Sequence, residues 1–396
     1  GFKTQKIRVG NAINFDVILE EDISALNEVV VTGYGTQKKV SIVGAIDNIA
    51  PSKLQVGSTR SLSNNLAGQI AGVIAVTRSG EPGYDNSNFW IRGISTFSGT
   101  TTPLVLVDGI ERDLNNIDPA EIESFSVLKD ASATAMYGVR GANGVIIINT
   151  RRGQVGPPSV DVRVEHSISE PTKLPGFIAG ADYMELLNEL KENKSQLPYS
   201  QEQIDKTRYG YDKDLYPDVN WIDQITKNYA YSTRANMSVA GGSDFLRYSL
   251  VASLYNEQGI IATDKTLPYN TGINLNRYNM RANVDLDITK TTTMRLNVGG
   301  YMQNRHGPNH SIDDLFSQAF VTSPIVYPTR YSDGTIPLVS YRSNPWATAT
   351  QSGYIVGINT QLQSLISLEQ NLRMITPGLK AKMSFSFDSF NYSGRI

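Results

Sequence analysis

Beyond residue 159, apolar and polar residues alternate along the chain with a period of two. In residues 246–254, LRYSLVASL, apolar side chains occupy every second position. Because successive side chains of a strand point to opposite faces of a sheet, this alternation predicts a strand with one apolar and one polar face. The pattern predicts seven such strands, near residues 160–168, 231–239, 246–254, 280–288, 294–298, 357–372 and 379–388.

The connections between these segments alternate in length. Long connections near 170–228, 257–272 and 305–356 alternate with tight turns at 241–244, 289–292 and 376–378. Membrane barrels join their strands alternately by short periplasmic turns and long extracellular loops. A soluble β-sandwich has no reason to sort its connections in this way. The pattern therefore favours a membrane β-barrel, with the three long connections outside the cell.

Seven strands are too few to close a large barrel. An open set would leave two unpaired strand edges in lipid, where backbone groups find no partner. Barrels that hold a plug in their lumen use about 22 strands. We therefore expect residues 156–396 to be the first part of a larger barrel, and the chain, which starts at Gly1, to be part of a longer polypeptide.

Residues 40–155 follow the pattern of a compact α/β domain. Short apolar segments predict strands, and the segment PLVLVDG ends at a turn signal formed by Asp108 and Gly109. Asp118 precedes a proline, with Glu121 in the third helical position, which predicts a capped start of a short helix. Three glycines then allow the backbone to bend before the strand VIIINT: Gly138, Gly141 and Gly144.

This domain offers little that suggests catalysis. The glycine run lacks the pattern of a phosphate-binding loop and leads into a strand rather than a helix. Glu121 and Glu123 form a carboxylate pair of the kind glycosidases use, but Glu121 is better explained by the helix start. No nucleophile, acid–base group and orienting group emerge together, so the sequence indicates no enzyme and no cofactor.

Composition narrows the picture further. The chain has 396 residues, no cysteine and a net charge of −2, which leaves no disulfide framework and does not favour nucleic acid as a partner. It has no run near 18 uninterrupted apolar residues of the kind that crosses a membrane as a helix.

Residues 26–39, LNEVVVTGYGTQKK, predict a short extended segment that ends at a glycine turn. Such a segment is either an internal strand or a strand that adds to the sheet edge of another protein. In addition, the run LAGQIAGV, the strand NFWIRG, the turn LVDG and the series DPAEIESFSVLKDASATAMYG follow downstream.

Together these residues resemble the SusC/RagA-like TonB-dependent outer-membrane transporters. The resemblance implies a TonB-box-like segment, pulled by the inner-membrane protein TonB, at Glu28, Val29, Val30, Val31, Thr32, Gly33, Tyr34 and Gly35. It also implies four parts: the end of a carboxypeptidase-regulatory-like β-domain (1–22), a TonB-box-like linker (23–39), a plug domain in the barrel lumen (40–155) and the barrel (156–396). Arg92, with Asp108 and its neighbours, is expected in a structural charge network of the plug.

The function implied by the resemblance is active import of a nutrient oligomer, a glycan or a peptide, across the outer membrane of a Gram-negative, Bacteroidetes-like bacterium. A SusD-like surface lipoprotein would cover the extracellular face, TonB would supply the energy, and outer-membrane lipid would surround the barrel. The alternative from another class is a binding or adhesion protein without energised transport. A siderophore or cobalamin receptor fits the motifs less well.

Aromatic residues in the long connections are the candidate substrate contacts. Flat rings beside amides and carboxylates suit sugars and peptides, although such rings also pack loops together. The candidates are Tyr209, Tyr211, Trp221, Tyr331 and Trp346. Two metal-site interpretations are weak, since Gly307-Pro308 separates His306 from His310, and the aspartates near 212–218 lack a calcium-loop pattern.

Overall fold

The computed structural model describes residues 29–32, 35–38, 46–55, 60–93, 101–191, 197–337 and 343–395. The chain divides into two compact units. The first contains the residues up to Arg78 and Asn86–Arg152, and the second contains Ser79–Asp85 and Gly153–Ile396. The expected β-domain at 1–22 lies outside the described residues.

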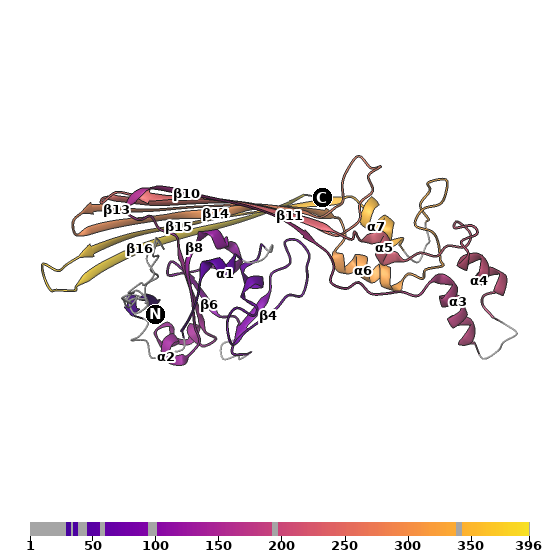
Figure 1. The fold of residues 1–396 in the computed structure, drawn as a ribbon, viewed down its shortest axis with the longest axis horizontal. Coiled ribbons are helices and arrows are strands. Elements are labelled where there is room, and N and C mark those ends of the chain that lie inside the picture. Colours follow the sequence, from indigo (N-terminus) through magenta and orange to yellow (C-terminus); the bar gives the residue numbers. More distant parts are fainter. Residues whose placement is uncertain are drawn as a thin grey trace, which may run out of the picture. The chain divides into compact units, whose positions relative to one another are not determined.

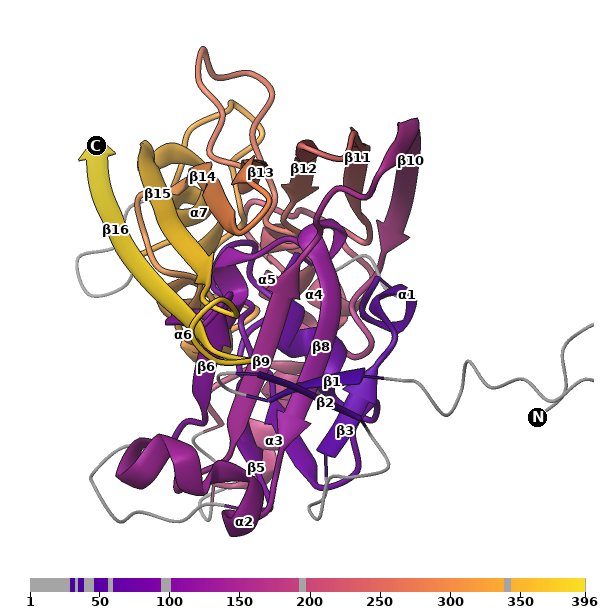
Figure 2. The ribbon, with the colours of Figure 1, turned by 90° about the vertical axis from the view of Figure 1, so that its left-hand side faces the viewer.

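The first unit is built on a mixed five-stranded sheet. Its strand order is β3-β8-β9-β6-β7, in which β6 and β9 are parallel and the other neighbours antiparallel. Figure 2 shows β3, β8, β9 and β6 of this sheet. The strands are β3 (Ile46–Ile49), β6 (Leu104–Val107), β7 (Ile110–Glu111), β8 (Ile122–Leu128) and β9 (Val145–Thr150). Val107, Ile122 and Ile148 are fully buried in the core of this unit.

Short helical turns and a separate hairpin complete the first unit. The hairpin pairs β4 (Val73–Val76) with β5 (Asn88–Ile91). The helical elements are α1 (Pro51–Leu54), η3 (Leu62–Leu66), η4 (Leu114–Asn116), η5 (Pro119–Glu121), α2 (Ala131–Thr134) and η6 (Ala135–Gly141). The helix expected after Asp118 is thus a single 3-10 turn, because β8 begins at the next residue.

The second unit contains seven long antiparallel strands in sequence order, as far as the described residues extend (Figure 2). They are β10 (Gly156–Ser169), β11 (Ala230–Gly242), β12 (Leu246–Gln258), β13 (Asn274–Thr289), β14 (Thr292–Pro308), β15 (Tyr354–Asn371) and β16 (Lys380–Arg395). The expected set of seven alternating strands after an α/β domain is confirmed. Several strands extend well beyond the predicted ranges, because the alternation fades near their ends.

The two faces of this sheet differ in polarity. Large apolar side chains are exposed on one face; Val162, Met237, Met280 and Phe385 are examples, each more than 45% exposed. Polar side chains on the other face are buried, among them Arg281, Asn283, Asn297 and Gln363. This is the reverse of a soluble sheet, which buries its apolar face, and it matches a barrel wall that is apolar outside and polar inside.

The long and short connections of the sheet lie at opposite ends of this unit (Figure 1). The short ones are residues 243–245, 290–291 and 372–379, the last being wider than the tight turn expected at 376–378. The long ones carry α3 (Gly180–Glu189), α4 (Gln201–Arg208), α5 (Trp221–Ile225), α6 (Ile312–Val321) and α7 (Pro345–Gln351). No helix among the described residues is long and apolar enough to cross a membrane.

Candidate functional site

A cavity of about 530 Å³ lies in the second unit, where the strands meet the long connections. This volume is within the range of small-molecule sites, about 300–1,000 Å³. Its wall combines residues 79–82, the last residue of β10 with the segment up to Pro175, the start of β11, and residues 257–261 at the end of β12 and just after it. Ile273, Ile312 and Phe316 complete the lining.

The cavity is largely apolar, with a few charged groups. Ile260, Ile261 and Leu174 contribute aliphatic surface, and the charged lining residues are Glu81, Glu170, Lys173 and Glu257. Burial raises the pKa of the Glu81 carboxyl, and the neighbouring Arg305 guanidinium opposes this shift. Apolar walls with a few polar groups are typical of ligand sites.

The three long connections share one hydrophobic core next to this cavity. Ile222 and Ile225 come from the first connection, Ile261 and Ile273 from the second, and Leu315 from the third. All five are at most 4% exposed. We refer to the three connections joined by this core as the loop layer. Packing in the core holds them together, so they are not independent loops.

Asp264 ties two of these connections together. Its carboxylate accepts hydrogen bonds from Gln351 Nε2 at 2.9 Å and from Arg330 at 2.6 Å, both in the third connection. It also accepts from the Thr266 hydroxyl at 2.7 Å and the Thr266 amide at 2.9 Å. The Thr266 donors, followed by those of Gln351 and Arg330, lower the pKa of Asp264 to about 2.

The five aromatic candidates lie in different surroundings. Tyr209 and Tyr211 are 81% and 77% exposed on the first connection. Tyr331 is 36% exposed, and Trp346 packs against the loop-layer core with the Arg330 guanidinium 4.8 Å from its ring centre. Trp221 is only 3% exposed.

The expectation that Trp221 contacts substrate is therefore corrected. Its indole packs in the loop-layer core, where Nε1 donates a hydrogen bond to the Ser323 carbonyl at 3.1 Å. A buried Trp whose single N–H donor is already hydrogen-bonded in this way exposes no ring face to a ligand. None of the five aromatic candidates is among the described residues that line the cavity.

The TonB-box-like segment is folded back on itself. Val29–Thr32 (β1) pairs in antiparallel register with Gly35–Lys38 (β2), with Val30 opposite Gln37. Glu28, Gly33 and Tyr34 lie outside the described residues. One edge of β1 is occupied by β2, and within the described chain its other edge has no strand partner.

The expected charge residues of the first unit form local contacts. Arg92 forms an ion pair with Asp130, and Glu111 forms one with Arg140. The Asp108 carboxylate accepts from the Thr150 amide at 3.1 Å and from its hydroxyl at 2.7 Å. Arg92 and Asp108 both have positive φ, 60° and 52°.

The remaining plug candidates shape turns. Asp108 and Gly109 (φ 86°) connect β6 to β7, and the Asp118 carboxylate accepts from the Ala120 amide at 2.8 Å, as expected of a cap. Glu121 closes this turn and is 1% exposed. Gly138, Gly141 and Gly144 lie in the bend before β9, and at Gly144 a Cβ atom would be 2.7 Å from Ile91 Cδ1.

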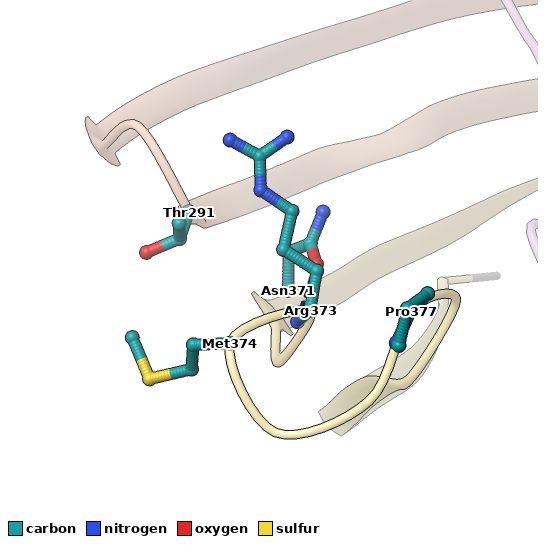
Figure 3. A pocket seen from close by; sticks show the side chains of 5 residues that line it. All are labelled: Thr291, Asn371, Arg373, Met374 and Pro377. Carbon is teal, nitrogen blue, oxygen red and sulfur yellow. Dashed lines mark hydrogen bonds between the residues drawn. The ribbon is translucent and has the colours of Figure 1, made fainter.

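A second hollow lies beside the connection between β15 and β16. Thr291, Asn371, Arg373, Met374 and Pro377 line it, and Figure 3 shows their side chains spread around an open turn rather than directed at one point. The Asn371 amide donates to the Thr291 carbonyl at 2.7 Å, so the two turns are joined by backbone. This hollow has no convergent polar groups and is the weaker candidate site.

The described residues contain no group of three or more His, Asp or Glu side chains suited to a metal ion. His306 Nδ1 lies 3.0 Å from the Gly272 carbonyl, and its ring stacks on Tyr354 with 4.8 Å between the centres. Asp218 accepts from the Gly180 amide at 2.7 Å. These contacts are structural: one lies within the first long connection and the other joins β14 to the second connection.

Comparison with known proteins agrees with this geometry. The sequence model of the TonB-dependent Receptor Plug Domain matches residues 38–145. TonB-dependent receptor SusC of Bacteroides thetaiotaomicron is 34% identical over 286 residues, which cover 69% of this chain and 27% of that protein. The chain belongs to the SusC/RagA-like TonB-dependent receptors. TonB-dependent receptor P3 of Formosa agariphila is 29% identical over 99% of this chain and 37% of that protein.

Solved structures of this family share the fold. The RagAB peptide importer in its "open-open" state superposes with a TM-score of 0.74 at 23% identity, covering 93% of this chain and 43% of that chain. Its "closed-closed" state gives a TM-score of 0.71. The chain spans about a third of the length of the curated relatives named above. Both of these relatives are named as receptors rather than enzymes.

The sequence did not indicate which residues form the cavity. The wall segment 79–82 and Arg305 are in contact but more than 220 positions apart in the chain. The only local signal was the turn sequence Gly-Glu-Pro-Gly at 80–83, which indicates a turn but not its partner.

Proposed function

We propose that this chain is the plug-bearing, N-terminal part of an outer-membrane importer that is energised by TonB. The observation that carries the proposal is the polarity of the second unit's sheet, apolar where exposed and polar where buried, next to a plug-domain sequence. In this role lipid contacts the apolar face, and the polar face lines a lumen. The protein would reside in the outer membrane of a Gram-negative bacterium.

The parts of the chain take the following roles in this proposal. Residues 23–39 form the TonB-box-like linker, 40–155 the plug and 156–396 the first part of the barrel, preceded by the end of a β-domain at 1–22. TonB would pair with the strand Val29–Thr32, since an extended segment with an open edge supports strand addition. The cavity and the exposed rings of Tyr209 and Tyr211 would meet the substrate.

The substrate proposed is a nutrient oligomer, a glycan or a peptide, delivered with a SusD-like lipoprotein at the extracellular face. The relationship to SusC and the RagAB assembly support such a partner, and the description of RagAB as a peptide importer supports the peptide class. The glycan class rests on the sequence resemblance alone. A cavity with aliphatic walls and a few carboxylates accommodates parts of either class.

Uptake by cells that express the full-length receptor tests the proposal. Fluorescently labelled pools of oligosaccharides and of tryptic peptides serve as probes. Uptake should stop when the proton gradient is collapsed and when residues 28–35 are deleted, while binding of the probe to the cell surface persists. Uptake that survives both treatments, or binding without any uptake, would instead indicate a binding or adhesion protein.

A further inference from the structure

The tip of the β4–β5 hairpin belongs to the second unit, although both of its strands belong to the first. Residues 79–85 group with the barrel strands, whereas the chain on either side groups with the plug. The base of this tip is fixed in the plug, because the Thr77 and Ser87 hydroxyls lie 2.6 Å apart. The Ser87 amide also donates to Ser63 Oγ at 3.0 Å and Asn64 Oδ1 at 2.9 Å.

One side chain of the barrel unit holds this tip. Arg305, on β14, forms an ion pair with Glu81, and its Nε donates to the Pro82 carbonyl at 3.0 Å. Its guanidinium also lies 4.8 Å from the centre of the Tyr84 ring. We call these contacts of Arg305 with Glu81, Pro82 and Tyr84 the Arg305 clasp.

Gly83 lets the tip approach Arg305 closely. Its φ is +92°, and a Cβ atom there would lie 3.1 Å from Arg305 Cδ and 3.4 Å from Leu275 Cδ1. A side chain at this position would therefore be strained by the backbone and crowded by Arg305. Glycine at this position thus leaves room for the Arg305 side chain, which supports a specific contact rather than a chance one.

The same tip forms part of the cavity wall. Residues 79–82 line the cavity of about 530 Å³, so a ligand there lies against the residues that Arg305 holds. The clasp consists of contacts from the Arg305 side chain, while its backbone stays paired between Leu275 on β13 and Gly357 on β15. Rotation of this side chain can therefore release Glu81, Pro82 and Tyr84 without breaking the barrel sheet.

We propose that the Arg305 clasp is a releasable latch, within the second unit, that holds residues 79–85 against β14. When closed, it keeps residues 79–82 in the cavity wall, and it opens when the plug moves during transport. Arg305 is then a positioning residue that links cavity occupancy to plug movement. This inference rests on the proposed import function. It adds that the Arg305 clasp is a contact that must break during transport.

A reversible cross-link in the full-length receptor tests the latch. Residues 1–396 contain no cysteine, so Glu81→Cys with Arg305→Cys introduces a thiol pair in this part of the receptor, which a short reducible bifunctional thiol reagent can join. The reference is the same double-cysteine receptor before joining, because Glu81 itself lines the cavity. Relative to that reference, we expect joining to leave binding of the labelled pools unchanged and to reduce uptake to the level of de-energised cells. Reduction of the cross-link should restore uptake.

The matched control joins two neighbouring barrel strands. Ala282→Cys and Val298→Cys are paired in register on β13 and β14, and their cross-link should leave uptake intact. Equal uptake by the two cross-linked receptors would overturn the latch, as would binding that is lost on joining the Glu81–Arg305 pair and regained on reduction. If the receptor shows no gradient-dependent uptake even after the cross-link is reduced, the proposed import function is wrong. This outcome is distinct from failure of the latch.

A measurement that needs no ligand tests the same idea. In the Arg305→Ala receptor, amide hydrogen exchange of residues 79–85 should become faster, while exchange along β13 and β15 stays unchanged. Arg305→Lys keeps a charge for Glu81 but not the forked geometry, so it should give an intermediate rate. Unchanged exchange at 79–85 in Arg305→Ala would show that Arg305 does not hold the tip, and would overturn the proposal.

Discussion

The ring of Trp221 lies edge-on to the ring of Tyr327, with 5.4 Å between their centres. Trp221 belongs to the connection after β10 and Tyr327 to the connection after β14, so the contact joins two loops that are about 100 residues apart. The same indole donates to the Ser323 carbonyl, which also lies in the connection after β14. The loop layer is thus held by a buried aromatic pair.

Removing this pair should loosen the loop layer. Replacing a buried Trp by Ala costs about 3–5 kcal/mol through lost burial and the cavity left behind. We expect Trp221→Ala to make the long connections cleavable by trypsin at a lower urea concentration. Tyr209→Ala is the control, since that ring is 81% exposed. Equal sensitivity of the two variants would show that Trp221 does not hold the layer.

The Asp264 tie should weaken in acid. Its pKa is lowered to about 2 by the Thr266 donors, followed by those of Gln351 and Arg330. A lowered carboxyl pKa stabilises the folded loops fully above the ordinary value of about 3.8 and loses this effect as the pH falls towards 2. Pepsin should therefore cut residues 323–337 increasingly between pH 4 and pH 2. Cleavage of Asp264→Asn should show no such increase with falling pH. If this variant and the unchanged receptor have the same pH profile of cleavage, the Asp264 carboxylate does not cause the increase.

Strand addition by TonB should depend on β1 and not on β2. Proline removes a backbone donor and disrupts a strand that is paired on that side. Val30→Pro should abolish capture of the receptor by the C-terminal domain of TonB, as measured by co-purification. Gln37→Pro, opposite Val30 in the hairpin, should leave capture intact or improve it by freeing β1. Capture that survives Val30→Pro would place the TonB contact elsewhere.

The bend before β9 should not accept a side chain at Gly144. Its φ is +91°, and a Cβ atom would lie 2.7 Å from Ile91 Cδ1. Overpacking of this kind costs about 1–3 kcal/mol beyond the backbone strain. Gly144→Ala should thus speed amide exchange in β9 more than Gly109→Ala, which has φ +86° but open space around it. Similar exchange rates in the two variants would show that backbone strain alone, and not the contact with Ile91, destabilises Gly144→Ala.

The exposed apolar face should reject charge if lipid covers it. Met280 is 58% exposed on this face. An arginine on the lipid side of a barrel costs about 2–4 kcal/mol near the middle of the bilayer. Met280→Arg should reduce the amount of heat-modifiable receptor in the outer membrane, whereas Met280→Leu should not. Normal assembly of Met280→Arg would argue that this face contacts water.

The sequence by itself determined the local features of this protein. The alternation in residues such as 246–254 predicted the barrel strands, because side-chain direction in a strand depends only on position along the chain. Asp108-Gly109 and the cap at Asp118 were likewise visible, since turns and caps involve neighbouring residues. The family resemblance rested on the same local runs.

Only the tertiary structure decided which distant residues meet. The sequence left open whether Trp221 contacts substrate or packs the loops together, and the fold places it in the loop-layer core. Asp264 meets Arg330 across 66 positions, and Glu81 meets Arg305 across 224. These partners are selected by how strands and loops pack in space, and no periodicity or local propensity records that choice.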